Sequence, residues 1–197
     1  MINSIKKKLL NIFKSIGYNI WFLLHGRIKG VIESNKHDSI KVINSALDKE
    51  HSYNIFKINN GRIYTDTVTD TAFIIENKII KEPSFQHRNP KNADILSNIV
   101  FQKGTPKYKK NLKGTVFSLL TGGGGNANYW HWLFDVLPRI NILENKVNLE
   151  NIDYFLFPDL KEKFQFETLN HLNIPVEKRL SSRVFRHVQT VEAIAVD

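Results

Sequence analysis

Apolar residues recur at three- and four-residue steps over residues 5–24, while polar side chains occupy the opposite face. The recurring positions are Ile5, Leu9, Ile12, Phe13, Ile16, Ile20, Leu23 and Leu24. This spacing predicts an amphipathic helix. Its uninterrupted apolar runs are shorter than the about 20 residues that a bilayer span requires. Two interpretations remain open: the apolar face packs on the domain, or residues 5–24 make peripheral contact with a membrane surface.

The pattern changes twice before the middle of the chain. Residues 27–50 are polar and mixed, which predicts a connector with a short helix. The next segment alternates between apolar and polar positions and is rich in β-branched and aromatic residues, which is typical of strands. The predicted strands are 53–58, 62–67 and 72–80, with a turn at 59–61 and a tight hairpin at 76–78. A polar, irregular stretch over 91–111 predicts a loop.

The second half of the chain predicts alternating strands and helices. A buried strand over 115–120 leads through glycines into a helix over 128–145, and a second buried strand follows at 153–157. This order is a βαβ unit, which implies parallel pairing and a right-handed crossover. A further helix is predicted at 161–172, with strands at 184–187 and 191–196.

These elements predict an α/β fold with a Rossmann-like parallel or mixed sheet. The expected organisation is a basic helical arm and connector over residues 1–50, followed by an α/β domain over residues 51–197. Because the pattern stops on a strand at 191–196, we expect the chain to be the front portion of a longer protein.

Composition narrows the classes of protein. The 197 residues are 42% hydrophobic, which is enough for a packed core. Cysteine is absent, which excludes a disulfide scaffold, thiol catalysis and thiolate metal sites. The net charge of +9 is concentrated in residues 1–36 and 103–113. A nearly neutral domain with two basic patches does not favour a nucleic-acid partner.

Four glycines, Gly122 to Gly125, stand between the strand at 115–120 and the helix at 128–145. Ligands of α/β folds bind at such places, and backbone N–H groups at a helix start favour an anion. Gly124 and Gly125 are therefore candidate ligand-binding residues. The spacing matches neither dinucleotide nor P-loop motifs, so a flexible surface loop is the competing interpretation.

His131, Asp135 and Arg139 follow at spacings of four, so a helix places them on one stripe. Asp135 could orient His131 as a catalytic base, or could itself be the base that His131 tunes. Arg139 could pair with Asp135 or with a ligand phosphate. A surface ladder of ion pairs is the competing interpretation. Pro138 is expected to bend or end the helix close to these residues.

Aromatic residues flank the histidine at Tyr129, Trp130 and Trp132. Their rings suit stacking on a sugar or a base, and they are equally ordinary as core residues. Paired histidines at metal-ligand spacing are missing, so no metal cofactor is predicted. The sequence also lacks the G-x-S-x-G motif of serine hydrolases.

The segment from Asn128 to Arg139, N-Y-W-H-W-L-F-D-V-L-P-R, resembles the characteristic segment of glycosyltransferase family 61. The resemblance includes the asparagine, tyrosine, histidine, aspartate, proline and arginine, and it extends in outline from about residue 60 to the end of the chain. It implies an inverting GT-B transferase that moves a sugar from a nucleotide-activated donor to an acceptor hydroxyl. Bacterial members are associated with capsular and other surface polysaccharides.

The resemblance also implies roles for residues of this chain. His131 and Asp135 become the candidates for deprotonating the acceptor, and Asn128, Tyr129 and Arg139 become substrate-binding residues, with Trp132 among the candidate aromatics. The partners are then a nucleotide sugar and a glycan acceptor. The expected location is the cytoplasm, with peripheral contact of residues 5–24 to the inner face of the membrane as the alternative left open above. A GT-B enzyme needs a second, nucleotide-sugar domain, so the chain alone is expected to be inactive.

Two other functions remain open from the sequence. One is a non-catalytic carbohydrate-binding or membrane-docking module that uses the aromatic cluster and the basic helix. The other is an unrelated nucleotide-binding protein that uses the glycine loop.

Overall fold

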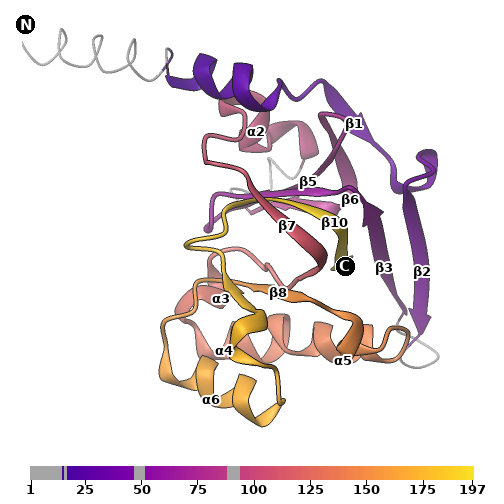
Figure 1. The fold of residues 1–197 in the computed structure, drawn as a ribbon, viewed down its shortest axis with the longest axis vertical. Coiled ribbons are helices and arrows are strands. Elements are labelled where there is room, and N and C mark those ends of the chain that lie inside the picture. The colour runs from indigo at the N-terminus through magenta and orange to yellow at the C-terminus, as the bar shows by residue number, and fades with distance from the viewer. Residues whose placement is uncertain (1–14, 16, 47–51, 88–93) are drawn as a thin grey trace, which may run out of the picture.

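The computed structural model describes residue 15 and residues 17–46, 52–87 and 94–197 (Figure 1). The fold is mixed α/β, and ten strands of the described residues form one sheet with parallel and antiparallel pairs. Residues 17–25 are helical, as the apolar spacing predicts. The earlier part of that predicted helix lies outside the described residues. No helix within the described ranges is long and apolar enough to span a membrane.

The first strands are β1 (Gly30–Ile32), β2 (Ile40–Ala46), β3 (Ser52–Asn59), β4 (Arg62–Thr65), β5 (Asp70–Ile75) and β6 (Lys78–Gln86). The later strands are β7 (Lys110–Ser118), β8 (Tyr154–Phe157), β9 (Arg179–Ser181) and β10 (His187–Val196). The helical segments used below are α2 (Ile99–Lys103), α3 (Gly124–Ala127), α4 (Tyr129–His131), the π-helical η4 (Trp132–Val136), α5 (Pro138–Glu144) and α6 (Lys163–His171). The remaining short helices are η1 (Ser34–Lys36), η3 (Ile95–Ser97), η5 (Leu149–Asn151) and η6 (Val176–Lys178).

Strands β7 to β10 form a four-stranded parallel part of the sheet, in the spatial order β9-β8-β7-β10. The chain moves outward from β7 to β8 to β9 and then returns to the other side of β7. The carboxyl ends of β7 and β10 therefore lie side by side, and open α/β sheets bind ligands just beyond the carboxyl ends of their strands. The predicted unit of strand, glycine loop, helix and strand is confirmed as β7, α3–α5 and β8.

Strands β3 and β4 lie end to end along β10 rather than folding back on each other. Both pair antiparallel with β10 in one continuous register, from Ile55 opposite Val196 to Tyr64 opposite His187. Asn60 adopts a positive φ of 52°, and its backbone N–H still donates to the carbonyl of Val191. The predicted turn at 59–61 is thus a kink within one long strand. On the edges that face away from β10, β3 pairs with β2 and β4 pairs with β5.

Alternating side chains of the central strands bury two cores, one on each face of the sheet. Phe117, Phe155 and Ile194 pack with the helices, together with Trp132 and Val136. Their sequence neighbours, among them Val116, Leu156 and Ala193, pack in a second cluster drawn from both halves of the sheet. Figure 1 shows α4, α5 and α6 on the first of these faces. A third cluster lies between α2 and strands β4 to β6.

The structure corrects several predicted elements. Residues 27–50 contain β1 and β2 as well as the predicted short helix, so a boundary at residue 50 does not separate a connector from the sheet. These strands escape prediction because β1 has only three half-exposed residues and β2 does not alternate, since Lys41, Val42 and Asn44 are exposed while Ser45 is buried. The predicted loop over 91–111 includes α2, whose first turn Asn98 caps. The predicted strand at 184–187 is wrong except at His187, and β9 precedes it.

Candidate functional site

The helix that carries the candidate residues is interrupted by one π-helical turn, η4. In this turn the Leu137 N–H donates to the Trp132 carbonyl, five residues back, at 3.1 Å. Proline has no backbone N–H, so Pro138 cannot continue the α-helical ladder, and it instead starts α5. The expectation that Pro138 would disturb the helix near these residues is confirmed. Asp135 lies within the π turn, and such turns are frequent at functional sites.

His131 and Asp135 form a close pair at the surface. His131 Nδ1 lies 2.6 Å from Asp135 Oδ2, and both side chains are a little less than half exposed. An ionised carboxylate only accepts hydrogen bonds. In a neutral His131, Nδ1 therefore holds the ring proton, and the lone pair of the ring is on Nε2.

The glycine loop leaves the space that the His131 ring occupies. A Cβ on Gly124 would lie 2.9 Å from His131 Cγ and Cδ2, closer than real Cβ contacts. The loop is held from both sides by Asn126, whose Nδ2 donates to the Thr67 carbonyl at 2.8 Å and whose Oδ1 accepts from the Asp159 N–H at 2.8 Å. The loop is therefore anchored to its neighbours, and Gly124 is a packing requirement of His131.

Arg139 extends from α5 to the carboxyl end of β10. Its Nε donates to the Asp135 carbonyl at 3.0 Å, and its Nη1 donates to the Val196 carbonyl. Desolvation by burial lowers the pKa of Arg139, while the carboxylates of Asp135 and Asp197 oppose that shift. The guanidinium of Arg139 is thus a partly desolvated cation near the carboxylates of Asp135 and Asp197.

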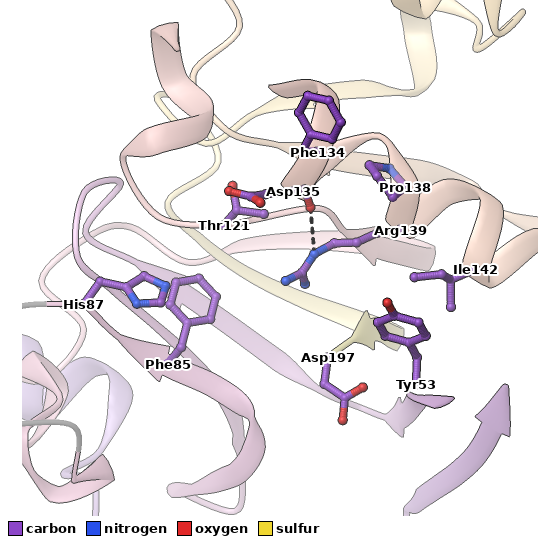
Figure 2. A pocket seen from close by; sticks show the side chains of 10 residues that line it. All are labelled: Tyr53, Phe85, His87, Thr121, Phe134, Asp135, Pro138, Arg139, Ile142 and Asp197. Atoms are coloured by element: carbon purple, nitrogen blue, oxygen red, sulfur yellow. Dashed lines mark hydrogen bonds between the residues drawn. The ribbon is translucent and has the colours of Figure 1, made fainter. Parts of the chain in front are cut away.

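These residues border a cavity of about 360 Å³, beyond the carboxyl ends of β7 and β10 (Figure 2). Its size is within the range of small-molecule sites. Figure 2 shows the Arg139 guanidinium pointing into the space between His87 on one side and Asp197 on the other. The lining residues are Tyr53, Phe85, His87, Thr121, Phe134, Asp135, Pro138, Arg139, Ile142 and Asp197. Asp135 lines the cavity and contacts His131, which is not itself among the lining residues.

Aromatic rings extend this site at the surface. The rings of Trp130 and Phe134 are stacked at a tilt, with centroids 4.3 Å apart, and both side chains are more than half exposed. Phe134 also lines the cavity. Large aromatic side chains are usually buried, so an exposed pair beside a cavity with both polar and apolar lining is typical of a binding surface.

Besides Gly124, four residues predicted to bind the ligand do not line the cavity. Trp132 is fully buried and donates from Nε1 to Thr168 Oγ1 at 2.9 Å, so it is a core residue and not a ligand-stacking one. Gly125 is buried too, where a Cβ would meet Pro158 and Thr121. Asn128 Oδ1 accepts from the backbone N–H groups of the following helix and acts as its N-cap.

Tyr129 is the fourth of these residues. It is exposed and packs edge-on against Phe164, outside the cavity lining.

Part of the cavity comes from distant segments of the chain that no local sequence pattern indicates. Tyr53, Phe85, His87, Thr121 and Asp197 stand at the starts or ends of strands, where polar or aromatic residues are common. The pairing of β10 with β3 and β7 brings Tyr53, Thr121 and Asp197 together. Phe85 and His87 come from the end of β6, where His87 lies beside Gly122. In the described residues, no group of three or more His, Cys, Asp or Glu side chains is arranged to hold a metal ion.

No family model matches the chain, and neither a curated protein nor a solved structure shows significant similarity to it. The chemistry of the site therefore rests on its geometry. A histidine whose tautomer is set by a carboxylate can accept a proton from a hydroxyl group. An adjoining cavity with one guanidinium, carboxylates, a hydroxyl and aromatic rings fits a polar ligand of small size.

Proposed function

We propose that the chain is the acceptor-side part of an inverting glycosyltransferase that resembles family 61 and has a GT-B arrangement. In this proposal β7 to β10 belong to its Rossmann-like half. The observation that carries the proposal is the pair of His131 and Asp135 at the edge of the cavity beyond β7 and β10. The position of the cavity supports it, because ligands of open α/β sheets bind beyond the carboxyl ends of their strands.

His131 is the proposed base of the reaction. Its Nε2 takes the proton of an acceptor hydroxyl, the hydroxyl oxygen attacks C1 of the donor sugar, and the bond from C1 to the diphosphate oxygen breaks. Asp135 keeps the proton of the neutral ring on Nδ1 and stabilises the imidazolium that forms, as the carboxylate of a Ser-His-Asp triad does. Asp135 is thus the positioning residue of the pair.

The cavity supports a sugar as the acceptor. Asp135, Asp197 and Arg139 offer hydrogen-bond partners for hydroxyl groups, and Thr121 adds a hydroxyl of its own. The exposed rings of Trp130 and Phe134 offer an apolar surface beside these groups. Among the residues that line this cavity, Arg139 is the only guanidinium or ammonium group. The proposal therefore assigns the nucleotide diphosphate to a second domain of the enzyme.

The test uses sugar transfer by the natural protein that carries this chain. Asp135→Asn places an amide beside His131; when the amide N–H₂ donates to Nδ1, the ring proton moves to Nε2 and the base is lost. We expect kcat to fall by about 10²- to 10⁴-fold in Asp135→Asn and in His131→Gln. Glu144→Gln, an exposed change on α5, is the matched control. Unchanged kcat in both site variants would contradict the proposal.

A non-catalytic carbohydrate-binding module is the second candidate, because the exposed Trp130 and Phe134 pair can bind a sugar ring without the histidine. The Asp135→Asn variant distinguishes the two functions, whereas Trp130→Ala does not. Glycan binding followed by saturation-transfer NMR should be weakened by Trp130→Ala in both cases. If Asp135→Asn leaves both binding and every measured transfer unchanged, the binding module is favoured.

A further inference from the structure

The two basic segments of the sequence meet at one surface of the molecule. The helix over residues 17–25 lies beside α2 at one end of the fold (Figure 1). Phe22 packs on Gly104, His25 Nε2 lies 3.1 Å from the Lys107 carbonyl, and Trp21 meets Tyr108 edge-on with centroids 5.2 Å apart. These contacts join residues 17–29 to residues 103–109, although about 80 residues separate them in the chain.

The helix has apolar residues on its outward face as well as on the face that packs on the domain. Trp21, Phe22 and His25 face the domain, whereas Ile20, Leu23 and Leu24 are 52%, 87% and 60% exposed. The exposed residues have i, i+3 and i+4 spacing, so they form one stripe on the side away from the packed residues. Packing on the domain therefore uses one face of this helix, and a second apolar face remains in contact with solvent.

Cations lie on and beside this helix. The exposed Arg27 guanidinium lies over the Phe22 ring, 4.2 Å from its centroid, and its Nη2 donates to Asn19 Oδ1 at 3.3 Å. Lys103 and Lys107 belong to the segment that packs against Phe22 and His25. Residues 17–29 and 98–113 contain no Asp or Glu. The local positive charge is thus not neutralised within either segment.

We propose that this surface, made of Ile20, Leu23 and Leu24 with Arg27, Lys103 and Lys107, docks the protein on an anionic lipid membrane. A membrane satisfies both parts of the surface, because the leucines enter the boundary between headgroups and acyl chains while the cations remain among the anionic headgroups. A nucleic acid would use the cations and leave the leucines exposed. The proposal is independent of the glycosyltransferase assignment.

The test measures cosedimentation of the full chain with vesicles. Binding is expected with phosphatidylcholine mixed with phosphatidylglycerol, and much less with phosphatidylcholine alone. Raising the salt from about 0.1 M to about 1 M shortens the Debye length from about 10 Å to about 3 Å and should weaken binding. Lys107→Gln should lower the partition coefficient about fivefold.

The leucines separate the membrane from other partners. Leu23→Ser with Leu24→Ser should lower vesicle binding by at least about tenfold. Val176→Ser with Val184→Ser is the matched control, because these valines are 71% and 57% exposed on other elements. Circular dichroism checks that each variant is folded. Equal loss in both pairs of variants would overturn the proposal.

Two further outcomes would also overturn it. The first is tighter binding of the chain to an RNA or DNA oligonucleotide than to the mixed vesicles, where Lys107→Gln weakens oligonucleotide binding and the double leucine variant does not. The second is formation of dimers, seen by analytical ultracentrifugation, that the leucine substitutions abolish while vesicle binding is unaffected.

Discussion

Arg139 joins the helix of the candidate site to β10, because its Nη1 donates to the backbone carbonyl of Val196. Its Nε simultaneously holds the Asp135 carbonyl at 3.0 Å. One planar guanidinium therefore spans the π turn and the carboxyl end of the central strand. This side chain fixes the position of the π turn relative to the sheet and also faces the cavity (Figure 2).

Replacement of Arg139 by lysine keeps the charge and loses the planar fork. A single ammonium group cannot reach both carbonyls with the same geometry. We expect Arg139→Lys to lower the free energy of unfolding by about 1 to 3 kcal/mol, measured by urea denaturation. Arg183→Lys, at an exposed position, should change it by less than about 0.5 kcal/mol. Equal effects in the two variants would contradict the role of Arg139.

Gly124→Ala tests the packing of the glycine loop beneath His131. The added Cβ would lie 2.9 Å from the ring carbons, so the imidazole must move away from Asp135. A displacement of about 1 Å at a reacting group can lower a rate about 10²-fold. The measurements are kcat and the NMR resonance of the His131 Nδ1 proton. Gly123→Ala is the control, because its added Cβ would meet the Val68 carbonyl at 3.2 Å and its nearest neighbours are atoms of Val68, not of His131. An unshifted resonance in Gly124→Ala would refute this packing role.

Trp132→Phe distinguishes a core residue from a ligand-binding one. The substitution removes the bond to Thr168 Oγ1 and part of a fully buried ring, so the free energy of unfolding should fall by about 1 to 3 kcal/mol. Trp130→Phe, at a side chain that is 67% exposed, should cost less than about 0.5 kcal/mol. Urea titrations of both variants give these values. The reverse order would place Trp132 back among the ligand-binding candidates.

His187 should make the protein less stable in acid. Burial lowers the pKa of His187 to about 3 from its ordinary value of 6.5, and the nearby charges of Arg62, His25 and Lys109 add to the shift, while the bond to the Lys107 carbonyl opposes it. Above pH 6.5 the histidine is neutral in both the folded and unfolded states, so it adds no pH dependence. Below pH 6.5 the unfolded state alone binds the proton.

The free energy of unfolding should therefore fall by about 1.4 kcal/mol per pH unit from this group between pH 6.5 and pH 3. Thermal unfolding at a series of pH values measures the slope. His187→Phe should have a shallower slope over this interval, whatever its stability at pH 7. His171→Gln, an exposed change on α6, should leave the slope as it is.

The sequence predicted the local parts of the fold and of the site. The βαβ unit from β7 to β8 and the hairpin predicted at 76–78 follow from short-range signals: apolar periodicity, the glycines, and turn residues, of which Glu76 and Asn77 have positive φ. The pair of His131 and Asp135 also follows from sequence spacing alone, because residues four apart are neighbours on a helix.

The remainder depends on contacts between distant segments. Nothing near Tyr53, His87 or Asp197 in the sequence indicates that they share a cavity, because β-sheet register is decided by the packed faces of the whole sheet. The burial of Trp132 depends likewise on α6, which supplies Thr168. Trp132 follows His131 in the sequence, but its ring is buried in the core against Phe157 and Phe164.

The central position of β10 has a consequence for how the chain folds. In the described sheet, β10 alone connects the antiparallel strands to β7, β8 and β9. Its contacts reach far back along the chain, as between Gln189 and Asn60, which are 129 residues apart. Contacts of such separation slow folding. During synthesis, the strands made first leave the ribosome with the edge that β10 will cover still unpaired, and an unpaired edge is a template for association with other chains. Chaperones that cover strand edges should therefore matter most for this protein before residues 187–196 emerge.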